Sequence, residues 1–347
     1  MTYAVDDQLI AILGRRQIIE GPEDRIRSAT LAKYQFAVNT LEQMQANEWH
    51  QKTPKLDKDS LEDLPVGTRN AVTRALAFLT NLDGIQLDNL MFNVVEHITD
   101  PTIRLCIARQ IWEEALHVAA YDKIIRTLYP NPLEVFALHE FNPQLKAKND
   151  IVLAQANRMR TTGFSPTNFI YAIVANIILE GVYFHNGFSL FYIIERLQRK
   201  LLGASDMVKY IQRDETTHCD GIFIPMYNAL FEERNELFTS DVISNILELF
   251  DTSVQLEKAW GHHIIQDGVP GMSEKSVDNH TMSLADKRLT SIRIKPLYGV
   301  QTDYPWIEEF AGAINKGEKN FFETTVTSYS KEPVKHIRGP QSFLGPL

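Results

Sequence analysis

A short pattern, Glu-x-x-His, occurs twice in this chain at well-separated positions. The first copy runs from Glu114 to His117, and the second runs from Glu215 to His218. On an α-helix, residues three apart project from nearly the same face, so each copy can direct a carboxylate oxygen and an imidazole nitrogen at one point. Oxygen and imidazole donors together suit iron or manganese, and suit zinc less specifically. The pattern therefore predicts a metal site.

Helical bundles that hold two metal ions use one Glu-x-x-His from each of two helices and one further carboxylate from each of two others. Glu180 is the only acid between residues 165 and 194, a strongly apolar stretch. A lone carboxylate there would carry a large desolvation cost, which a metal ion would offset. Asp83 is the best candidate for the remaining helix, with Asp88 and Glu96 as competitors. We therefore predict a dinuclear metal centre.

A single Glu-x-x-His would be weak evidence, because the pattern often arises by chance on a solvated helix face. Two copies with apolar neighbours, together with an isolated buried acid, are much less expected by accident. The pairs Glu96-His97 and His262-His263 are predicted to be surface or helix-end residues. The cysteines, Cys106 and Cys219, are predicted to be ordinary, partly buried thiols.

Apolar residues recur at close to the helical period through most of the chain, and alternating strand patterns are few and short. We therefore predict an all-α bundle with the metals between four core helices. The expected helices cover residues 68–97, 101–128, 150–162, 165–202, 205–230, 241–265 and 283–294. We expect the fourth to break at Gly187 and the fifth to kink near Pro225.

The segment 168–194 is long and apolar enough to span a bilayer. It contains Asn176, Glu180, His185 and Asn186, and an ionisable group is costly in lipid. We therefore expect a central helix buried on all sides in a soluble bundle, with no membrane contact.

Composition excludes several classes of protein. The 347 residues are 44% hydrophobic, which is enough for a large core, and carry 44 acidic and 35 basic residues for a net charge of -9. The sequence contains no Lys/Arg cluster of the kind that binds nucleic acid, so we do not expect a nucleic-acid partner. The N-terminus shows no secretory signal pattern, and two cysteines suit a reducing compartment. We therefore predict a cytoplasmic location.

The C-terminal part of the chain differs from the rest. Residues 325–347 contain three prolines and little periodicity. We predict one helical domain over residues 1–324 and a flexible tail over residues 325–347.

In its motifs the chain resembles the small (β) subunit of class I ribonucleotide reductase, from about Phe36 to the C-terminal tail. The family's order of ligands is Asp, Glu-x-x-His, Glu, Glu-x-x-His. It is matched by Asp83, Glu114 with His117, Glu180, and Glu215 with His218. The resemblance implies a ferritin-like fold, a homodimer, and a large catalytic α subunit as partner.

The resemblance also assigns roles near the metals. The radical-bearing tyrosine of the family corresponds to Tyr121, four residues after His117. Its apolar pocket corresponds to Phe184, Phe188 and Ile211.

Three further residues match the family's radical-transfer chain. They are Trp49 near the N-terminus, Asp214 just before the second Glu-x-x-His, and Tyr329 in the tail, with Glu323 upstream of it. Asp214 is expected to hydrogen-bond His117. Many relatives end in an acidic peptide. This tail departs from that pattern, because it is basic and ends in apolar residues, namely Phe343, Leu344 and Leu347.

By this resemblance, the metal centre reacts with an oxidant and oxidises Tyr121, and the radical equivalent passes to the α subunit, which reduces ribonucleotides. A di-iron centre is the first expectation, and dimanganese and mixed centres are the alternatives. The rival functions are a di-iron oxidase or monooxygenase acting on its own substrate and a ferritin-like iron store. Tyr121, Trp49 and Tyr329 favour the reductase, because a self-contained oxidase needs no exit for the radical. The chain has no P-loop pattern, which agrees with substrate sites on the partner.

Overall fold

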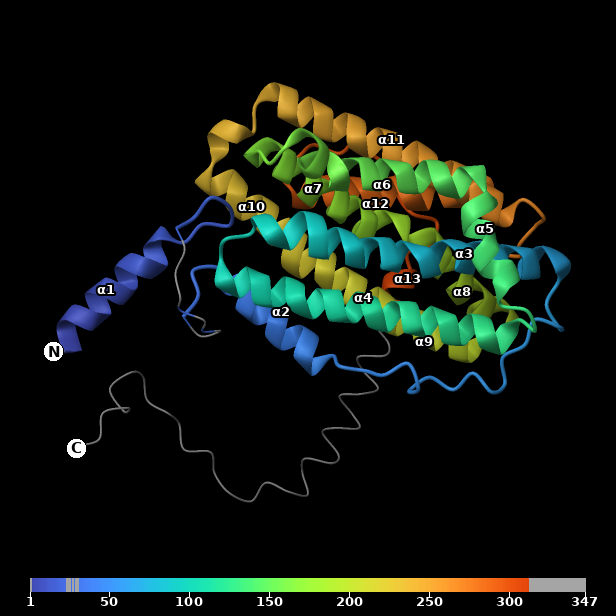
Figure 1. Cartoon of the computed structure of the whole chain (residues 1–347). Coiled ribbons are helices and arrows are strands. Elements are labelled where there is room, and N and C mark those ends of the chain that lie inside the picture. The colour runs from blue at the N-terminus through green and yellow to red at the C-terminus, as the bar shows by residue number, and fades with distance from the viewer. Residues whose placement is uncertain (1, 23–25, 27, 29–30, 312–347) are drawn as a thin grey trace, which may run out of the picture.

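The computed structural model describes residues 2–22, 26, 28 and 31–311, and these residues form a bundle of helices (Figure 1). Within this part of the chain there is no strand, and one isolated bridge joins Ile19 to Ile98. The prediction of an all-α fold is confirmed. The predicted tail and Tyr329 lie outside the described residues.

The main helices follow each other along the whole described chain. They are α1 (Thr2–Arg15), α2 (Gln35–Ala46), α3 (Val66–Asn89), α4 (Pro101–Leu128), α5 (Leu133–Phe141), α6 (Pro143–Thr162), α7 (Pro166–Ile178), α8 (His185–Gln198), α9 (Leu202–Thr217), α10 (Ile224–Glu233), α11 (Ser240–Ile265), α12 (Glu274–Ser291) and α13 (Ile307–Ala311). Three π-helical turns adjoin them: η1 (Leu90–Val94), η3 (Leu179–Tyr183) and η4 (His218–Phe223). Two short 3-10 turns are η2 (Val95–His97) and η5 (Asn235–Leu237).

Helix starts follow local sequence signals. The side chain of Asp100 accepts hydrogen bonds from the backbone N–H groups of Thr102 and Ile103, both at 2.9 Å, and Pro101 opens α4. Ser165 caps α7 in the same way, just before Pro166. A side-chain acceptor satisfies N–H groups that the first turn leaves unpaired, and proline suits the first helical position. These signals therefore define where both helices begin.

The helices that carry the predicted ligands pack directly on one another. Helix α3 lies along α4, α4 contacts α9 and η4, and η3 contacts both α9 and η4 (Figure 1). Helices α6, α11 and α12 cover α7. Helix α1 extends away from this bundle.

The continuous stretch Pro166–Gln198, made of α7, η3 and α8, is the central helix of the bundle. Among the described residues it alone is long and apolar enough to cross a membrane. Its most apolar window is 89% buried inside the bundle. The prediction of a buried central helix is confirmed.

The structure corrects several predicted boundaries. The central helix does not break at Gly187, which lies inside α8, where an added Cβ would stand 3.1 Å from the side chain of Leu79. The glycine therefore permits close packing on α3, and the irregularity falls at η3 instead. The turn η4 ends just before Pro225, near the predicted kink. Helix α12 begins at Glu274, well before the predicted residue 283. The prediction missed its first turns because they are polar and show little apolar period.

Four of the described helices were not predicted at all. They are α1, α2, α5 and α13. Helix α2 is short, and its buried residues include Thr40 beside a few apolar ones, so its apolar face is narrow. Short helices of this kind depend on tertiary packing more than on periodicity.

Candidate metal centre

Five segments bring the six predicted ligands into one fully buried cluster. Helix α3 provides Asp83, α4 provides Glu114 and His117, η3 provides Glu180, α9 provides Glu215, and η4 begins with His218. Two of these segments are π-helical turns, which are rare and frequent at functional sites. The competitors Asp88 and Glu96 are exposed and lie outside the cluster.

The ligand atoms form two overlapping groups, each within 4.8 Å. One group contains Asp83, Glu114, His117 and Glu215, and the other contains Glu114, Glu180, Glu215 and His218. The groups share two carboxylates, Glu114 and Glu215. Two neighbouring cations bridged by carboxylates fit this arrangement.

Both imidazoles present Nδ1 to the cluster. Nδ1 of His117 lies 3.0 Å from Glu215 Oε1 and 3.8 Å from Asp83 Oδ2. Nδ1 of His218 lies 2.9 Å from Glu215 Oε2 and 3.6 Å from Glu180 Oε2. Each ring therefore leaves Nε2 to bind an outer partner.

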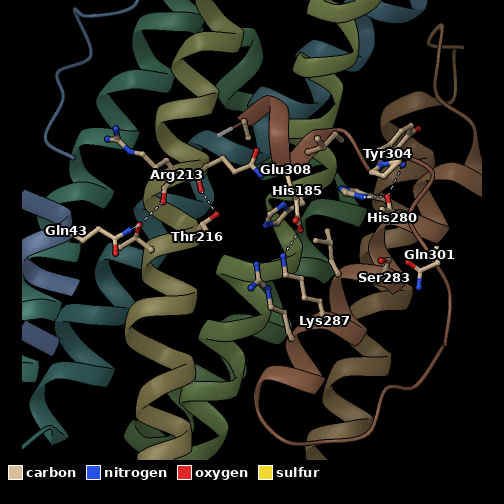
Figure 2. Close-up of a pocket in the computed structure, with 18 residues that line it drawn as sticks. Gln43, His185, Arg213, Thr216, His280, Ser283, Lys287, Gln301, Tyr304 and Glu308 are labelled. Atoms are coloured by element: carbon tan, nitrogen blue, oxygen red, sulfur yellow. Dashed lines mark hydrogen bonds and ion pairs between the residues drawn. The ribbon is translucent and has the colours of Figure 1, made fainter. Parts of the chain in front are cut away.

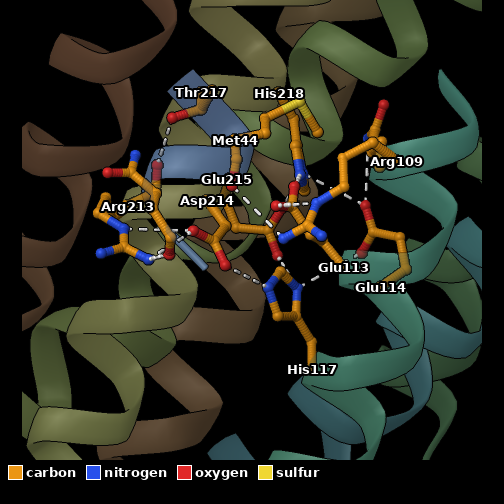
Figure 3. Close-up of polar contacts among 12 residues, drawn as sticks. Met44, Arg109, Glu113, Glu114, His117, Arg213, Asp214, Glu215, Thr217 and His218 are labelled. Carbon is orange, nitrogen blue, oxygen red and sulfur yellow. Dashed lines mark hydrogen bonds and ion pairs between the residues drawn. The ribbon is translucent and has the colours of Figure 1, made fainter. Parts of the chain in front are cut away.

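The outer partners cross between the two motifs (Figure 3). Nε2 of His117 lies 3.2 Å from Oδ2 of Asp214, and Nε2 of His218 lies 2.9 Å from Oε2 of Glu113. Each acid directly precedes the Glu of the other motif. Such partners orient a ligand imidazole and raise its basicity. The expected hydrogen bond between Asp214 and His117 is present. The contact between Glu113 and His218 was not predicted, although the sequence offered a signal for it, because an acid directly precedes each Glu-x-x-His.

Beyond Asp214 the contacts lead to an indole. Nε1 of Trp49 donates a hydrogen bond of 2.6 Å to Oδ2 of Asp214, the same oxygen that faces His117. Arg213 donates to the other carboxylate oxygen at 3.2 Å. Burial raises the pKa of Asp214, but the hydrogen bond and charge of His117, with smaller contributions from Arg213 and Trp49, hold it below its usual range. A continuous hydrogen-bonded chain thus joins His117 to Trp49.

Beyond Glu113 the contacts lead to a guanidinium. Nε of Arg109 donates to Oε1 of Glu113 at 3.0 Å, and the Arg109 side chain also reaches the carbonyl of Met44 (Figure 3). This side of the cluster ends in a fixed positive charge.

The buried carboxylates of the cluster favour the binding of cations. Burial raises the pKa of both Asp83 and Glu180 well above the usual range, and the charge of Glu215 raises both further. Both oxygens of Asp83 and one oxygen of Glu114 and of Glu180 have no hydrogen-bond partner within the described part of the chain. Buried carboxylate oxygens without partners are costly, and divalent iron or manganese accepts this oxygen and nitrogen set. The residues therefore fit a dinuclear centre.

Two glutamines orient Glu180 and were missed in the sequence. Nε2 of Gln110 donates to Oε1 of Glu180 at 2.9 Å, and Nε2 of Gln86 makes a short contact with the same oxygen. Oε2 stays free to face the cluster. Their spacing could have indicated this role, because Gln86 follows Asp83 by three residues and Gln110 precedes Glu114 by four. Residues at these spacings share a helix face with the ligand.

The turn that carries Glu180 is also held from α6. The ammonium of Lys148 donates to the carbonyl of Tyr183, the last residue of η3, at 3.1 Å and pairs with Glu257. Both charged groups are fully buried. Burial lowers the pKa of Lys148 to about 8 and raises that of Glu257 to about 7. Polar contacts therefore hold the π-helical turn η3 at Glu180 and at Tyr183.

Tyr121 lies on α4, one turn after His117, and is fully buried. Its phenol oxygen has no hydrogen-bond partner among the described residues. Burial raises its pKa well above the usual range, and the charge of Asp83 raises it further. All three predicted pocket residues, Phe184, Phe188 and Ile211, are also fully buried, and the ring centroids of the two phenylalanines lie 5.7 Å apart.

Comparison with known proteins agrees with this geometry. The family described as "Ribonucleotide reductase, small chain" matches residues 29–305. The "Ribonucleoside-diphosphate reductase subunit beta" of Chlamydia pneumoniae is 30% identical, over 82% of this chain and 84% of that protein. The protein of the same name from Treponema pallidum is 27% identical, over 92% of each.

A solved structure shows the same fold. The "Ribonucleotide reductase R2 subunit from Clostridium botulinum" superposes with a TM-score of 0.80 and 28% identity, covering 85% of this chain and 94% of that chain. The family match over residues 29–305 includes all six residues of the buried carboxylate–histidine cluster. The chain therefore belongs to the ribonucleotide reductase small-chain family and acts as the small subunit of ribonucleoside-diphosphate reductase.

Proposed function

We propose that the buried cluster holds the dinuclear metal centre of this subunit. The observation that carries the proposal is the sharing of Glu114 and Glu215 between two groups of ligand atoms. Asp83 and His117 would complete one position, and Glu180 and His218 would complete the other, so six residues would supply two positions with four residues each. When bound, the metals supply the oxidising capacity that a radical subunit needs. Iron is the first expectation, with dimanganese and mixed centres as alternatives, because the donors accept both metals.

We propose that Tyr121 carries the radical. Its phenol lies in a buried site near the cluster, with no hydrogen-bond partner among the described residues. Burial would shield the oxidised ring from bulk solvent and lengthen its lifetime. Trp49 and Asp214 would carry the oxidising equivalent outward, since they form a hydrogen-bonded chain from His117.

Metal analysis with electron paramagnetic resonance tests both proposals. Apoprotein is loaded separately with Fe(II) and Mn(II) and then exposed to an oxidant. We expect two metals per chain and a tyrosyl signal with the metal that supports activation. The control is Tyr121→Phe, which should keep the metals and lose the signal. A signal that persists unchanged in Tyr121→Phe would assign the radical to another tyrosine, and wild-type protein without bound metal would overturn the centre.

We propose a homodimer. Large exposed apolar side chains lie on η1 and α4, including Phe92 at 52% and Trp112 at 57% exposure. Large exposed apolar groups mark interaction surfaces. Light scattering should give twice the chain mass, whereas a cage-sized particle would favour iron storage.

We propose that the large α subunit binds through the tail, residues 325–347, with Tyr329 as the redox step between subunits. Its apolar residues Phe343, Leu344 and Leu347 suit burial on a partner. Deleting residues 340–347 should weaken association and leave the radical intact. Tyr329→Phe should leave association unchanged and abolish nucleotide reduction. Normal reduction by Tyr329→Phe would leave the tail as a tether only.

We propose a cytoplasmic location. Cys106 and Cys219 are both free and buried, which suits a reducing compartment. Cell fractionation tests this directly.

A further inference from the structure

A line of buried amide side chains leads away from Glu180. Nε2 of Gln86 contacts Oε1 of Glu180, Nδ2 of Asn89 donates to Oε1 of Gln86 at 3.0 Å, and Nδ2 of Asn93 lies 3.4 Å from Oδ1 of Asn89. From α7, Asn176 Oδ1 accepts from both Gln86 and Asn89. We call Gln86, Asn89, Asn93 and Asn176 the amide ladder. All four are buried in an otherwise apolar bundle.

The outer end of the ladder opens on a cavity of about 460 Å³ between α3, η1 and α6. Asn89 and Asn93 form part of its wall, and Asp88 and Arg160 are exposed side chains that line it. Asn93 is only 5% exposed, and its Oδ1 has no hydrogen-bond partner among the described residues. An unpaired, buried oxygen therefore stands where the cavity meets the ladder.

The chemistry of the ladder suits a divalent cation. Fe²⁺ and Mn²⁺ must exchange water for other oxygen ligands before they enter an apolar core, and side-chain amide oxygens are suitable ligands. The neighbouring residues of α7, such as Ile173 and Ile177, offer no oxygen from their side chains. The ladder thus supplies the polar groups that join this cavity to Glu180.

Another cavity near the cluster carries more positive charge (Figure 2). It lies between α9, α12 and α13, has a volume of about 510 Å³, and is lined by Arg213, Lys287 and Arg288 together with the carboxylate of Glu308. This excess of positive charge disfavours entry of a cation.

From this contrast we propose that divalent cations reach Glu180 through the cavity at α3, η1 and α6 and along the amide ladder. Asn93 Oδ1 would be the first buried ligand on the way. The inference rests on the proposed dinuclear centre and adds the direction from which it is filled.

The rate of metal uptake tests the proposal. Full-length apoprotein is mixed with Mn²⁺, and the electron paramagnetic resonance signal of free Mn²⁺ is followed as it falls. Asn93→Leu removes the first ligand with little change of volume, so uptake should slow by roughly 10-fold or more while the final content is kept, since the loss of one polar contact to an ion raises the barrier. Asn93→Asp keeps an oxygen there and should load at least as fast as wild type.

Asn81→Leu is the matched control, because Asn81 also lies on α3 but donates to the carbonyl of Ala77 and lines a different cavity. It should load at the wild-type rate. Uptake by Asn93→Leu at the wild-type rate would overturn the proposal, as would equal slowing in Asn81→Leu.

Two exposed positions test the cavity without disturbing the core. Asp88→Asn should slow uptake about 2- to 5-fold at low ionic strength, and Arg160→Gln should speed it, with both effects lost at high salt. No response to either change would place the entrance elsewhere. Failure of the proposed centre is distinguishable, because wild-type protein itself would then bind no Mn²⁺.

Discussion

The two halves of the buried cluster have the same plan and different surroundings. In each half an imidazole presents Nδ1 to the cluster and Nε2 to an acid from the other motif. Both acids contact a guanidinium, that of Arg213 beside His117 and that of Arg109 beside His218, and only the acid beside His117 is also bonded to an indole, that of Trp49. An indole can be oxidised and a guanidinium cannot. The difference lies in this one oxidisable side chain, and it is the basis of the proposed role of Trp49 in electron transfer.

The largest expected effect comes from removing what the halves share. Glu215→Ala deletes a carboxylate of both ligand groups, so metal affinity should fall by more than the roughly 100-fold that loss of an outer partner costs. Glu180→Ala should damage one position more than the other. Metal content per folded chain, checked by circular dichroism, measures both. Full loading of Glu180→Ala with two metals would remove that residue from the site.

The next effect separates the two halves by function. Trp49→Phe keeps a buried aromatic ring and loses the oxidisable N–H partner of Asp214, so nucleotide reduction with the α subunit should fall to background. Arg109→Met, its counterpart in the other half, should retain reduction once metal is loaded. Both variants should still form the Tyr121 signal. Equal losses of turnover would mean that the halves do not differ in this way.

A smaller effect should be common to both halves. Asp214→Asn and Glu113→Gln each weaken the hydrogen bond that orients an imidazole, and each should lower metal affinity by about 10- to 100-fold. Competition with a chelator gives these affinities. Only Asp214→Asn should also reduce turnover at full loading. If Glu113→Gln binds metal like wild type, its contact with His218 has no part in holding the ligand.

The smallest effect concerns Tyr121. Its hydroxyl is buried with no hydrogen-bond partner among the described residues, so Tyr121→Phe should change the free energy of unfolding by only about 1 kcal/mol or less. Denaturant unfolding of the apoprotein measures this. A loss of several kcal/mol would reveal a partner for the phenol, for which bound water is the first candidate. Tyr192, another fully buried tyrosine, provides the matched Tyr192→Phe control.

Much of the fold followed from periodicity and caps. The long helices α4 and α11 begin and end close to the predicted residues, because their apolar faces are regular and capping side chains precede them. Helix α3 begins close to its predicted start but ends at Asn89 instead of residue 97, and η1 and η2 follow it. Helix α12 was placed too late, since its polar first turns become buried only through packing on α11. The turn η3 was missed because a π-helical turn has no distinct side-chain pattern.

By itself the sequence determined the types of the six candidate ligands and their approximate order on helices. Spacing along a helix is a local property, so Glu114 and His117 must share a face wherever the helix lies. Only the tertiary structure decided which residues meet across helices. The contact between His218 and Glu113 joins residues 105 apart, and that between Trp49 and Asp214 joins residues 165 apart. Such contacts depend on how whole helices pack, and no short stretch of sequence contains that information.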